Sequence, residues 1–349
     1  MKILITGGAG FIGSNFARHV LRHHPADKIL VVDKLTYAGN LRNLSNLLDG
    51  DNSRCQFVRM DIADPSLAEI AKGCDAAVHF AAESHVDRSI EDAAPFVQTN
   101  VEGSWRVVEA CRASRVSRFI HVSTDEVYGS LGREGKFSEC SPLAPTSPYA
   151  ASKAASDLLV LAAVKTHGFP GVVTRCSNNY GPFQFPEKFI PLMISRALAG
   201  QHLPVYGDGR QIRDWIHVQD HCQALDLILR QGREGEVYNI GGECELENLT
   251  VAHKILRSVD RPDDLLKFVA DRPAHDRRYA LDCSKLKNEL GWAPAWDFDQ
   301  GLAETLSWYR ANIAWLEEIL SGEYQKYFER HYLRREETFA ASSTKRGQS

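Results

Sequence analysis

The sequence has no long hydrophobic run and no excess of basic residues. None of its apolar segments approaches the roughly 18 residues that span a bilayer, so we expect no membrane partner. The formal net charge of −4 and the pI of about 6.4 give no electrostatic reason to bind nucleic acid. These two absences exclude the membrane-spanning and the strongly basic nucleic-acid-binding classes.

Closely spaced cysteines are also missing. Eight cysteines are spread singly from Cys55 to Cys283, with no CxxC pair and no Cys/His cluster at zinc-ligand spacing, so we expect no metal site. Met1 leads directly into a predicted strand, which leaves no room for a signal peptide. Together these features predict a cytoplasmic protein with reduced thiols.

Length and composition indicate a globular enzyme of two structural units. The chain has 349 residues, of which 44% are hydrophobic and 25% charged. Protein domains typically contain about 150 residues, so a chain of this length is expected to have more than one hydrophobic core. Residues 336–349 have little hydrophobicity and are predicted to form a mobile tail, and no internal repeat is present.

The stretch from Phe119 to Lys153 carries the candidate chemistry. The apolar run FIHVS predicts a buried strand, and Thr124, Asp125 and Glu126 follow at its end. An open α/β sheet presents its ligands at the carboxyl ends of its strands, so a hydroxyl and two carboxylates are expected in the site. Two neighbouring carboxylates in a closed site rarely both ionise, which lets one act as acid and the other as base.

A helix predicted to begin near Tyr149 carries the second candidate pair. Tyr149 and Lys153 are four residues apart and therefore share one helix face. A nearby ammonium favours the phenolate, so we expect Lys153 to lower the pKa of Tyr149 towards that of a general base. Either the pair or the strand-end carboxylates alone also fits chance spacing or a simple cap, but their combination favours catalysis.

The amino-terminal segment is typical of a dinucleotide-binding unit. Gly7, Gly10 and Gly13 lie between a predicted strand and helix, where missing side chains let the backbone approach a pyrophosphate. Asp33 ends the second predicted strand, twenty residues after Gly13. An acidic residue there accepts hydrogen bonds from ribose hydroxyls and repels a 2′-phosphate, which favours NAD over NADP, although Lys34 weakens this preference.

Taken together, these motifs resemble the extended short-chain dehydrogenase/reductase family and, within it, the nucleotide-sugar 4,6-dehydratases, from Met1 to about Tyr332. The resemblance implies a Rossmann-type doubly wound parallel sheet with a smaller α/β substrate lobe. We expect the first domain at 1–177, rejoined by about 214–241. The nucleotide-sugar lobe would comprise about 178–213 and 242–335.

The resemblance also implies binding residues. Cofactor contacts are implied at Gly7, Gly10, Phe11, Ile12, Gly13, Asp33, Lys34, Leu35, Thr36, Asp61, Ile62, Phe80, Ala81, Ala82, Ser84, Thr99, Tyr149, Lys153 and Asn179. Substrate contacts are implied at Ser84, Thr124, Asn178, Lys188, Phe189, Pro204, Val205, Tyr206, Arg213, Asn248, Asp271, Arg272 and His275.

Other residues carry weaker signals. Guanidinium forks suit a diphosphate, yet arginines beside aspartates are also typical of a solvated surface, so the residues alone leave the role of Arg213 and Arg272 open. His79 and His85 are interpreted as hydrogen-bonded core residues without a catalytic role. The helix after Tyr149 is expected, by resemblance, to pair with its copy in a homodimeric four-helix bundle, whereas packing within one subunit is the alternative.

The resemblance implies a complete reaction on dTDP-glucose, with NAD as a bound catalyst. Tyr149 takes the C4 hydroxyl proton, Glu126 removes the C5 proton, and protonated Asp125 expels the C6 hydroxyl as water. Thr124 hydrogen-bonds the C4 oxygen, and Lys153 orients the ribose. The alternatives are UDP- or CDP-glucose as substrate, a 4-epimerase or UDP-glucuronate decarboxylase, and a non-catalytic NAD-binding regulator.

Overall fold

The structure is a computed structural model that describes residues 1–48 and 54–320. The tail predicted at 336–349 and the end of the second expected domain, 321–335, lie outside the described residues. Within the described part of the chain, no helix combines the length and the apolar character needed to cross a membrane. All eight cysteines are described, and all are free thiols.

A seven-stranded sheet organises the first lobe, and all its neighbouring strands are parallel. In spatial order the strands are β10 (Val237–Ile240), β6 (Gly171–Cys176), β5 (Arg118–Thr124), β4 (Ala76–His79), β1 (Lys2–Thr6), β2 (Lys28–Asp33) and β3 (Cys55–Arg59). The chain runs outward from β1 to β3 and then resumes at β4 on the other side of β1. This confirms the doubly wound Rossmann-type sheet, whose switch point lies between β1 and β4.

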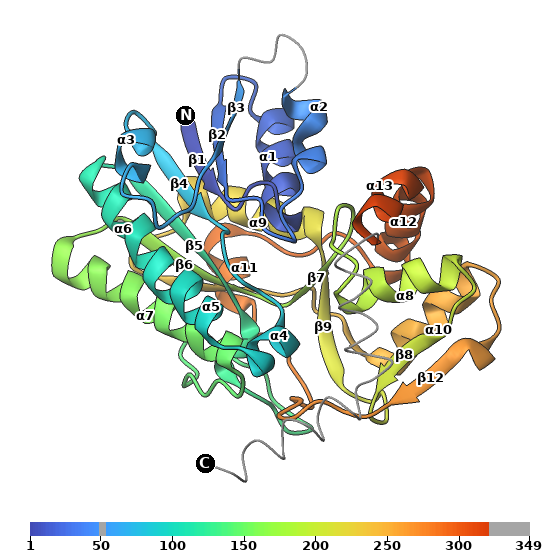
Figure 1. Ribbon diagram of the computed structural model, residues 1–349. Coiled ribbons are helices and arrows are strands. Elements are labelled where there is room, and N and C mark those ends of the chain that lie inside the picture. The colour runs from blue at the N-terminus through green and yellow to red at the C-terminus, as the bar shows by residue number, and fades with distance from the viewer. Residues whose placement is uncertain (49–53, 321–349) are drawn as a thin grey trace, which may run out of the picture.

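Helices cover both faces of this sheet (Figure 1), as the nearly continuous apolar strands require. One face packs against α1 (Phe11–His23), α9 (Val218–Gln231) and α11 (Ser284–Leu290). The other packs against α3 (Leu67–Ala71), α6 (Ser104–Ala113) and α7 (Pro148–His167). The helix α9 and the strand β10 therefore pack with the first lobe.

The second lobe has its own core and two small sheets (Figure 1). Its core is formed by α8 (Phe189–Leu198), α10 (Asn248–Ser258), α12 (Phe298–Ala311) and α13 (Ile313–Leu320). The three-stranded sheet is β11 (Glu245–Glu247), β9 (Ile212–His217) and β7 (Asn178–Tyr180), and β12 (Leu266–Val269) pairs with β8 (Leu203–Tyr206). The strand β9, expected to rejoin the first lobe, instead pairs with β7 and β11 because its hydrogen-bonding edges face those strands.

Short elements complete the described chain. They are η1 (Leu41–Leu44), α2 (Ser45–Leu48), α4 (Val86–Glu91), α5 (Ala94–Phe96), the π-helical η2 (Val97–Gly103), η3 (Asp125–Tyr128) and η4 (Asp263–Leu265). Of these, η3 and α4 bear on the site. The first carries the two candidate carboxylates, and the second lies between the two lobes (Figure 1).

The long helix α7 shows how local sequence sets the site. The Ser147 hydroxyl caps its start by accepting a hydrogen bond from the amide of Ala150 at 3.1 Å, and Pro148 occupies the first helical position. Gly168 ends the helix with φ of 60°, which a residue without Cβ adopts at little cost. These signals place Tyr149 in the first turn, beside the carboxyl end of β5.

Candidate active site

Two adjoining cavities lie at the carboxyl ends of the strands. The larger, of about 360 Å³, extends from the turn after β1, past the ends of β2, β4, β5 and β6, to the second lobe. The smaller, of about 150 Å³, lies between α4 and the second lobe. Both are lined by Glu126, Asn178, Glu187, Lys188, Phe189 and Trp215, so they form parts of one cleft.

The larger cavity brings the five candidate catalytic residues together. Its lining includes Thr124, Asp125, Glu126, Tyr149 and Lys153. All the expected cofactor residues line it as well, with the exception of Leu35, whose side chain packs against the core on the α1 side of the sheet. Side chains separated by more than a hundred residues thus converge because parallel strands all end at one edge.

The glycine-rich turn leaves space for a ligand backbone. Gly7 adopts φ of 69°, and a Cβ on Gly13 would lie 2.5 Å from the carbonyl oxygen of Gly7, so a side chain is disfavoured at both of these positions. The helix α1 begins directly after Gly10, with no side-chain cap on its amides. Free amides at a helix N-terminus beside a cavity suit a pyrophosphate. The turn therefore fits a dinucleotide.

Asp33 is held rigidly at the end of β2. Its two carboxylate oxygens accept hydrogen bonds from the amides of Ala9 at 3.0 Å and Leu35 at 2.8 Å. Each carboxylate oxygen keeps a further lone pair that can accept a hydroxyl of a ribose. The Lys34 ammonium lies 2.6 Å from a carboxylate oxygen of Asp61, so this lysine already has an acidic partner.

The two candidate carboxyl groups, Asp125 and Glu126, differ in how far their surroundings raise their pKa values. The pKa of Asp125 is raised well above its usual value by burial and by the charge of Glu126. Burial also raises the pKa of Glu126, but the positive charges of Arg272, Lys188 and Arg213 oppose this rise. Asp125, whose pKa is raised the more strongly, is therefore the better proton donor of the pair, and Glu126, with three cations nearby, is the better base.

The Tyr149 and Lys153 pair departs from one expectation. Burial, together with the charge of Glu126, raises the pKa of Tyr149 well above its usual value, so the predicted lowering by Lys153 is wrong for this structure. Burial lowers the pKa of Lys153 to about 8, although the charge of Asp157 opposes the change. The Lys153 ammonium donates to the carbonyl oxygen of Val122 at 2.9 Å, which holds it at the carboxyl end of β5.

The smaller cavity collects most of the expected substrate residues. Its lining includes Asn178, Lys188, Phe189, Pro204, Tyr206, Arg213, Asn248, Arg272 and His275. Ser84 and Thr124 line only the larger cavity. Val205 is buried elsewhere, since side chains alternate along β8, and Asp271 contributes indirectly by accepting a hydrogen bond from His275 at 2.6 Å.

Several polar atoms around the cleft are buried without a hydrogen-bond partner. Among the described residues they include Asp125 Oδ2, Asn178 Oδ1, Asn248 Oδ1 and Arg272 Nε, all from residues that line a cavity. Leaving a buried polar group unpaired costs about 1–3 kcal/mol, so a ligand with matching donors and acceptors would be favoured here. The arginine and lysine side chains around them suit an anionic ligand.

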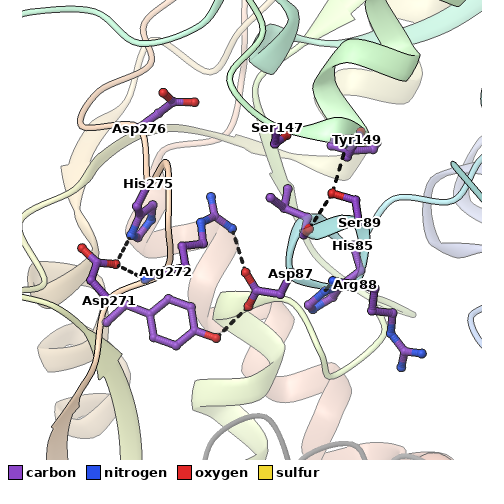
Figure 2. A network of polar contacts seen from close by, with 12 residues as sticks. His85, Asp87, Arg88, Ser89, Ser147, Tyr149, Asp271, Arg272, His275 and Asp276 are labelled. Carbon is purple, nitrogen blue, oxygen red and sulfur yellow. Dashed lines mark hydrogen bonds and ion pairs between the residues drawn. The ribbon is translucent and has the colours of Figure 1, made fainter. Parts of the chain in front are cut away.

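Residues of α4 contact both the second lobe and the start of α7 (Figure 2). Asp87 accepts a hydrogen bond from the Tyr206 hydroxyl at 2.8 Å and lies 3.5 Å from Arg272. Ser89, two residues on, accepts a hydrogen bond from the amide of Tyr149 at 3.2 Å. One short helix therefore contacts both the second lobe and the start of α7.

Sequence reasoning missed several residues of the cleft. Glu187 lines both cavities, burial raises its pKa to about 7, and it accepts a hydrogen bond from the Tyr37 hydroxyl at 3.0 Å. Tyr279 and Asp87 line the smaller cavity. The sequence could have indicated these residues only through their neighbours: Glu187 directly precedes Lys188, which was expected to bind substrate, and Tyr279 directly follows Arg277 and Arg278. His79 and His85 are both buried, hydrogen-bonded residues as predicted, and His85 also lines the smaller cavity.

The parallel sheet, the glycine turn and the Tyr149/Lys153 pair define an enzyme of the short-chain dehydrogenase/reductase class. A family model described as GDP-mannose 4,6 dehydratase matches residues 4–305. The chain belongs to this family of nucleotide-sugar enzymes.

Individual relatives narrow the comparison. A dTDP-glucose 4,6-dehydratase of Streptomyces niveus is 53% identical over 328 residues, which cover 93% of this chain and 97% of the relative. The crystal structure of DesIV, a dTDP-glucose 4,6-dehydratase of Streptomyces venezuelae with NAD and TYD bound, is 50% identical, with a TM-score of 0.89 over 91% of this chain and 100% of that one. A UDP-glucose 4-epimerase of Thermus thermophilus in complex with NAD is 28% identical, with a TM-score of 0.82 over 89% and 100% of the two chains.

Proposed function

We infer that this protein is an NAD-dependent dTDP-glucose 4,6-dehydratase, which converts dTDP-glucose to dTDP-4-keto-6-deoxyglucose and water. One observation carries the assignment beyond the fold. Asp125, which is buried, and the adjacent half-buried Glu126 both line the cavity that also contains Tyr149 and Lys153. A 4-epimerase needs the Tyr/Lys pair but expels no C6 hydroxyl, so it has no use for the acid at Asp125. Relatives that share about half of this sequence carry the same activity in their names.

The residues of the larger cavity fit NAD at its full length. The glycine turn would hold the pyrophosphate, and Asp33 the adenosine ribose. Lys153 would orient the ribose nearest the reacting sugar. Bound NAD⁺ supplies a hydride acceptor and a positive charge that favours the Tyr149 phenolate.

The catalytic groups have separate roles. Tyr149 takes the proton of the C4 hydroxyl as C4 is oxidised, and Thr124 donates a hydrogen bond to the C4 oxygen. Glu126 then removes the C5 proton, which the C4 ketone has acidified, and Asp125 protonates the departing C6 hydroxyl. After reduction at C6, Glu126 returns a proton to C5. The result is loss of one water without net oxidation.

The smaller cavity supplies the nucleotide-sugar site in this proposal. Arg213 and Arg272 lie on the same cavity and have the planar donor geometry that phosphate oxygens favour. His275 and Tyr206 would complete the contacts on the nucleotide side. Binding energy from this remote part of the substrate helps to seat the hexose against Tyr149.

One assay tests the activity and its substrate together. Purified protein is incubated with dTDP-, UDP-, CDP- and GDP-glucose, and mass spectrometry detects loss of one water. We expect dehydration of dTDP-glucose with a large preference over the other bases. Isomerisation without water loss would favour a 4-epimerase, and no reaction with any of the sugars would contradict the enzyme assignment.

We also propose that the protein is a homodimer formed through α6 and α7. These helices pack side by side on one face of the sheet, and Leu158 on α7 is 58% exposed. Val97, the first residue of the η2 segment that leads into α6, is 55% exposed. Pairing with a second copy would cover both side chains in a four-helix bundle. Light scattering of the wild type and Leu158→Glu tests this, because a buried charge should dissociate the dimer; a variant that stays dimeric would exclude this surface.

A further inference from the structure

A buried chain of hydrogen bonds joins the last described helix to the dinucleotide turn. The indole nitrogen of Trp315, on α13, donates to Asn43 Oδ1 at 2.9 Å. Asn43 Nδ2 donates in turn to the carbonyl oxygen of Ala9 at 2.9 Å, and the amide of Ala9 donates to Asp33 at 3.0 Å. Residues 272 positions apart in the sequence thus meet behind the glycine-rich turn.

Asn43 suits this position chemically. An indole N–H only donates hydrogen bonds, and a backbone carbonyl only accepts them. A side chain that joins the two must therefore accept at one end and donate at the other, as a carboxamide does. Asn43 is buried, so losing either partner would leave an unpaired polar group.

Ala9 is the part of the turn that this chain of hydrogen bonds holds. It lies between Gly8 and Gly10, is fully buried, and does not line the cavity that Gly7 and Gly10 line. Its carbonyl oxygen also accepts a hydrogen bond from the amide of Asn40 at 3.1 Å. The glycines that let the backbone approach a pyrophosphate also leave the turn free to move, so an anchor on Ala9 limits that freedom.

The rest of the second lobe keeps Trp315 in place. Its ring lies 5.0 Å from that of Trp308, measured between centroids, and contacts Phe183 edge-on. The Arg18 guanidinium, on α1, lies over the Phe183 ring, 4.1 Å from its centre. Aromatic packing from the second lobe therefore backs the helix that follows the glycine turn.

We propose that Trp315 and Asn43 are positioning residues of the dinucleotide site, through which α13 of the second lobe holds the Gly7–Gly10 turn and Asp33 in their binding geometry. The proposal rests on the NAD-dependent function proposed above. Neither side chain touches the cofactor in this arrangement. Each acts through Ala9, so its removal weakens cofactor binding because the turn must then be ordered on binding.

The test measures NAD binding directly in the full-length protein. Trp315→Phe keeps an aromatic ring and removes the donor, and Asn43→Asp keeps the acceptor for Trp315 but cannot donate to Ala9. Trp308→Phe is the matched control, because it removes an indole from the same aromatic cluster but not the donor to Asn43. The protein is freed of nucleotide, and its affinity for added NAD is measured by calorimetry.

We expect NAD affinity to fall roughly tenfold in Trp315→Phe and in Asn43→Asp, about the effect of one buried hydrogen bond, and to change less than twofold in Trp308→Phe. At saturating NAD, the KM for the nucleotide sugar should remain within about twofold of the wild-type value in all three. Unchanged NAD affinity in Trp315→Phe, or an equal loss in Trp308→Phe, would overturn the proposal.

The two proposals fail in different ways. A wild type that binds NAD but dehydrates no nucleotide sugar would contradict the proposed function, and the loss of affinity in Trp315→Phe would still support the positioning role. A wild type that dehydrates dTDP-glucose while Trp315→Phe binds NAD normally would remove only the positioning role.

Discussion

A carboxylate oxygen of Asp87 lies 3.5 Å from Nη1 of Arg272, so a residue of the first lobe forms an ion pair with a guanidinium of the second (Figure 2). Both side chains line the smaller cavity. The Arg272 Nε is buried without a hydrogen-bond partner among the described residues, which leaves it available to a ligand. Asp87 therefore orients a group that the proposed function assigns to the diphosphate.

Asp87→Asn should weaken substrate binding more than catalysis. The amide would turn an N–H₂ group or a neutral oxygen towards Arg272, and the guanidinium would lose the charge that orients it. We expect the KM for dTDP-glucose to rise about tenfold and kcat to change less than threefold, measured by steady-state kinetics. Asp92→Asn, on the surface just after α4, is the control. An unchanged KM would show that Asp87 does not orient Arg272.

Asp125→Asn and Tyr149→Phe should stop the reaction at different steps. The amide cannot protonate the C6 hydroxyl, so oxidation at C4 should continue while water loss falls by about 10²–10⁴. Reduced cofactor should then accumulate and absorb in the near ultraviolet under single-turnover conditions. Tyr149→Phe should show no such absorbance because it lacks the group that takes the C4 proton. Equal loss of both steps in both variants would contradict the assigned roles.

Lys153→Met should lose activity yet gain stability near neutral pH. Burial lowers the folded-state pKa of Lys153 to about 8, below its unfolded value, so at pH 7 the folded state holds an ammonium that burial disfavours. Replacing Lys153 with Met should raise the free energy of unfolding by about 1–3 kcal/mol at pH 7. This figure allows for the loss of the hydrogen bond from Lys153 to the carbonyl oxygen of Val122.

The sign of this effect depends on pH. Below pH 8 the lysine is charged in both states, and the cost of burying it is present in full. As the pH rises from the folded-state pKa of about 8 to the unfolded-state pKa of about 10.4, the buried lysine of the wild type loses its proton, and the cost of burying a charge disappears. The advantage of Lys153→Met in urea unfolding should therefore be largest at pH 7 and nearly absent by about pH 10.5. An advantage that grew with pH would contradict the prediction.

Asp33 should make the protein select NAD. Its carboxylate is fixed by the amides of Ala9 and Leu35 at the edge of the cavity, where it would repel a 2′-phosphate. The extracted cofactor should be NAD, with an affinity at least about a hundredfold above that for NADP, as judged by calorimetry. Asp33→Asn should narrow this difference chiefly by improving NADP binding. Equal affinities in the wild type would refute the assignment.

Isotope labelling tests the whole reaction. A mixture of C4-deuterated and unlabelled dTDP-glucose should give product labelled at C6 without exchange between molecules, because the enclosed site gives the transferred hydrogen no route to solvent. Reaction in heavy water should place deuterium at C5, where Glu126 would return the proton. A label found at C4, or scrambled between product molecules, would exclude the dehydratase mechanism.

Local patterns in the sequence predicted the framework of this protein. The strand before Thr124, the strand that ends at Asp33 and the helix capped at Ser147 all form where apolar periodicity and capping residues place them. All strands of a parallel sheet end at the same edge. Asp33 and Thr124 each end a strand, and Tyr149 lies in the first turn of α7, which follows the second of these strands, so the sequence predicted that the three residues would lie close together. The alternation of side chains along β8 also explains why Val205, between Pro204 and Tyr206, turns away from the cavity.

Tertiary structure alone decided the properties that depend on distant neighbours. The pKa of Tyr149 rises because burial outweighs the charge four residues away, and the sequence does not reveal how deeply a side chain is buried. β9 joins the small sheet because β7 and β11 offer it hydrogen-bonding edges. The contacts of Asp87 with Arg272 and of Asn43 with Trp315 join residues 185 and 272 positions apart. Such contacts arise from the packing of one lobe on the other, which leaves no local pattern in either segment.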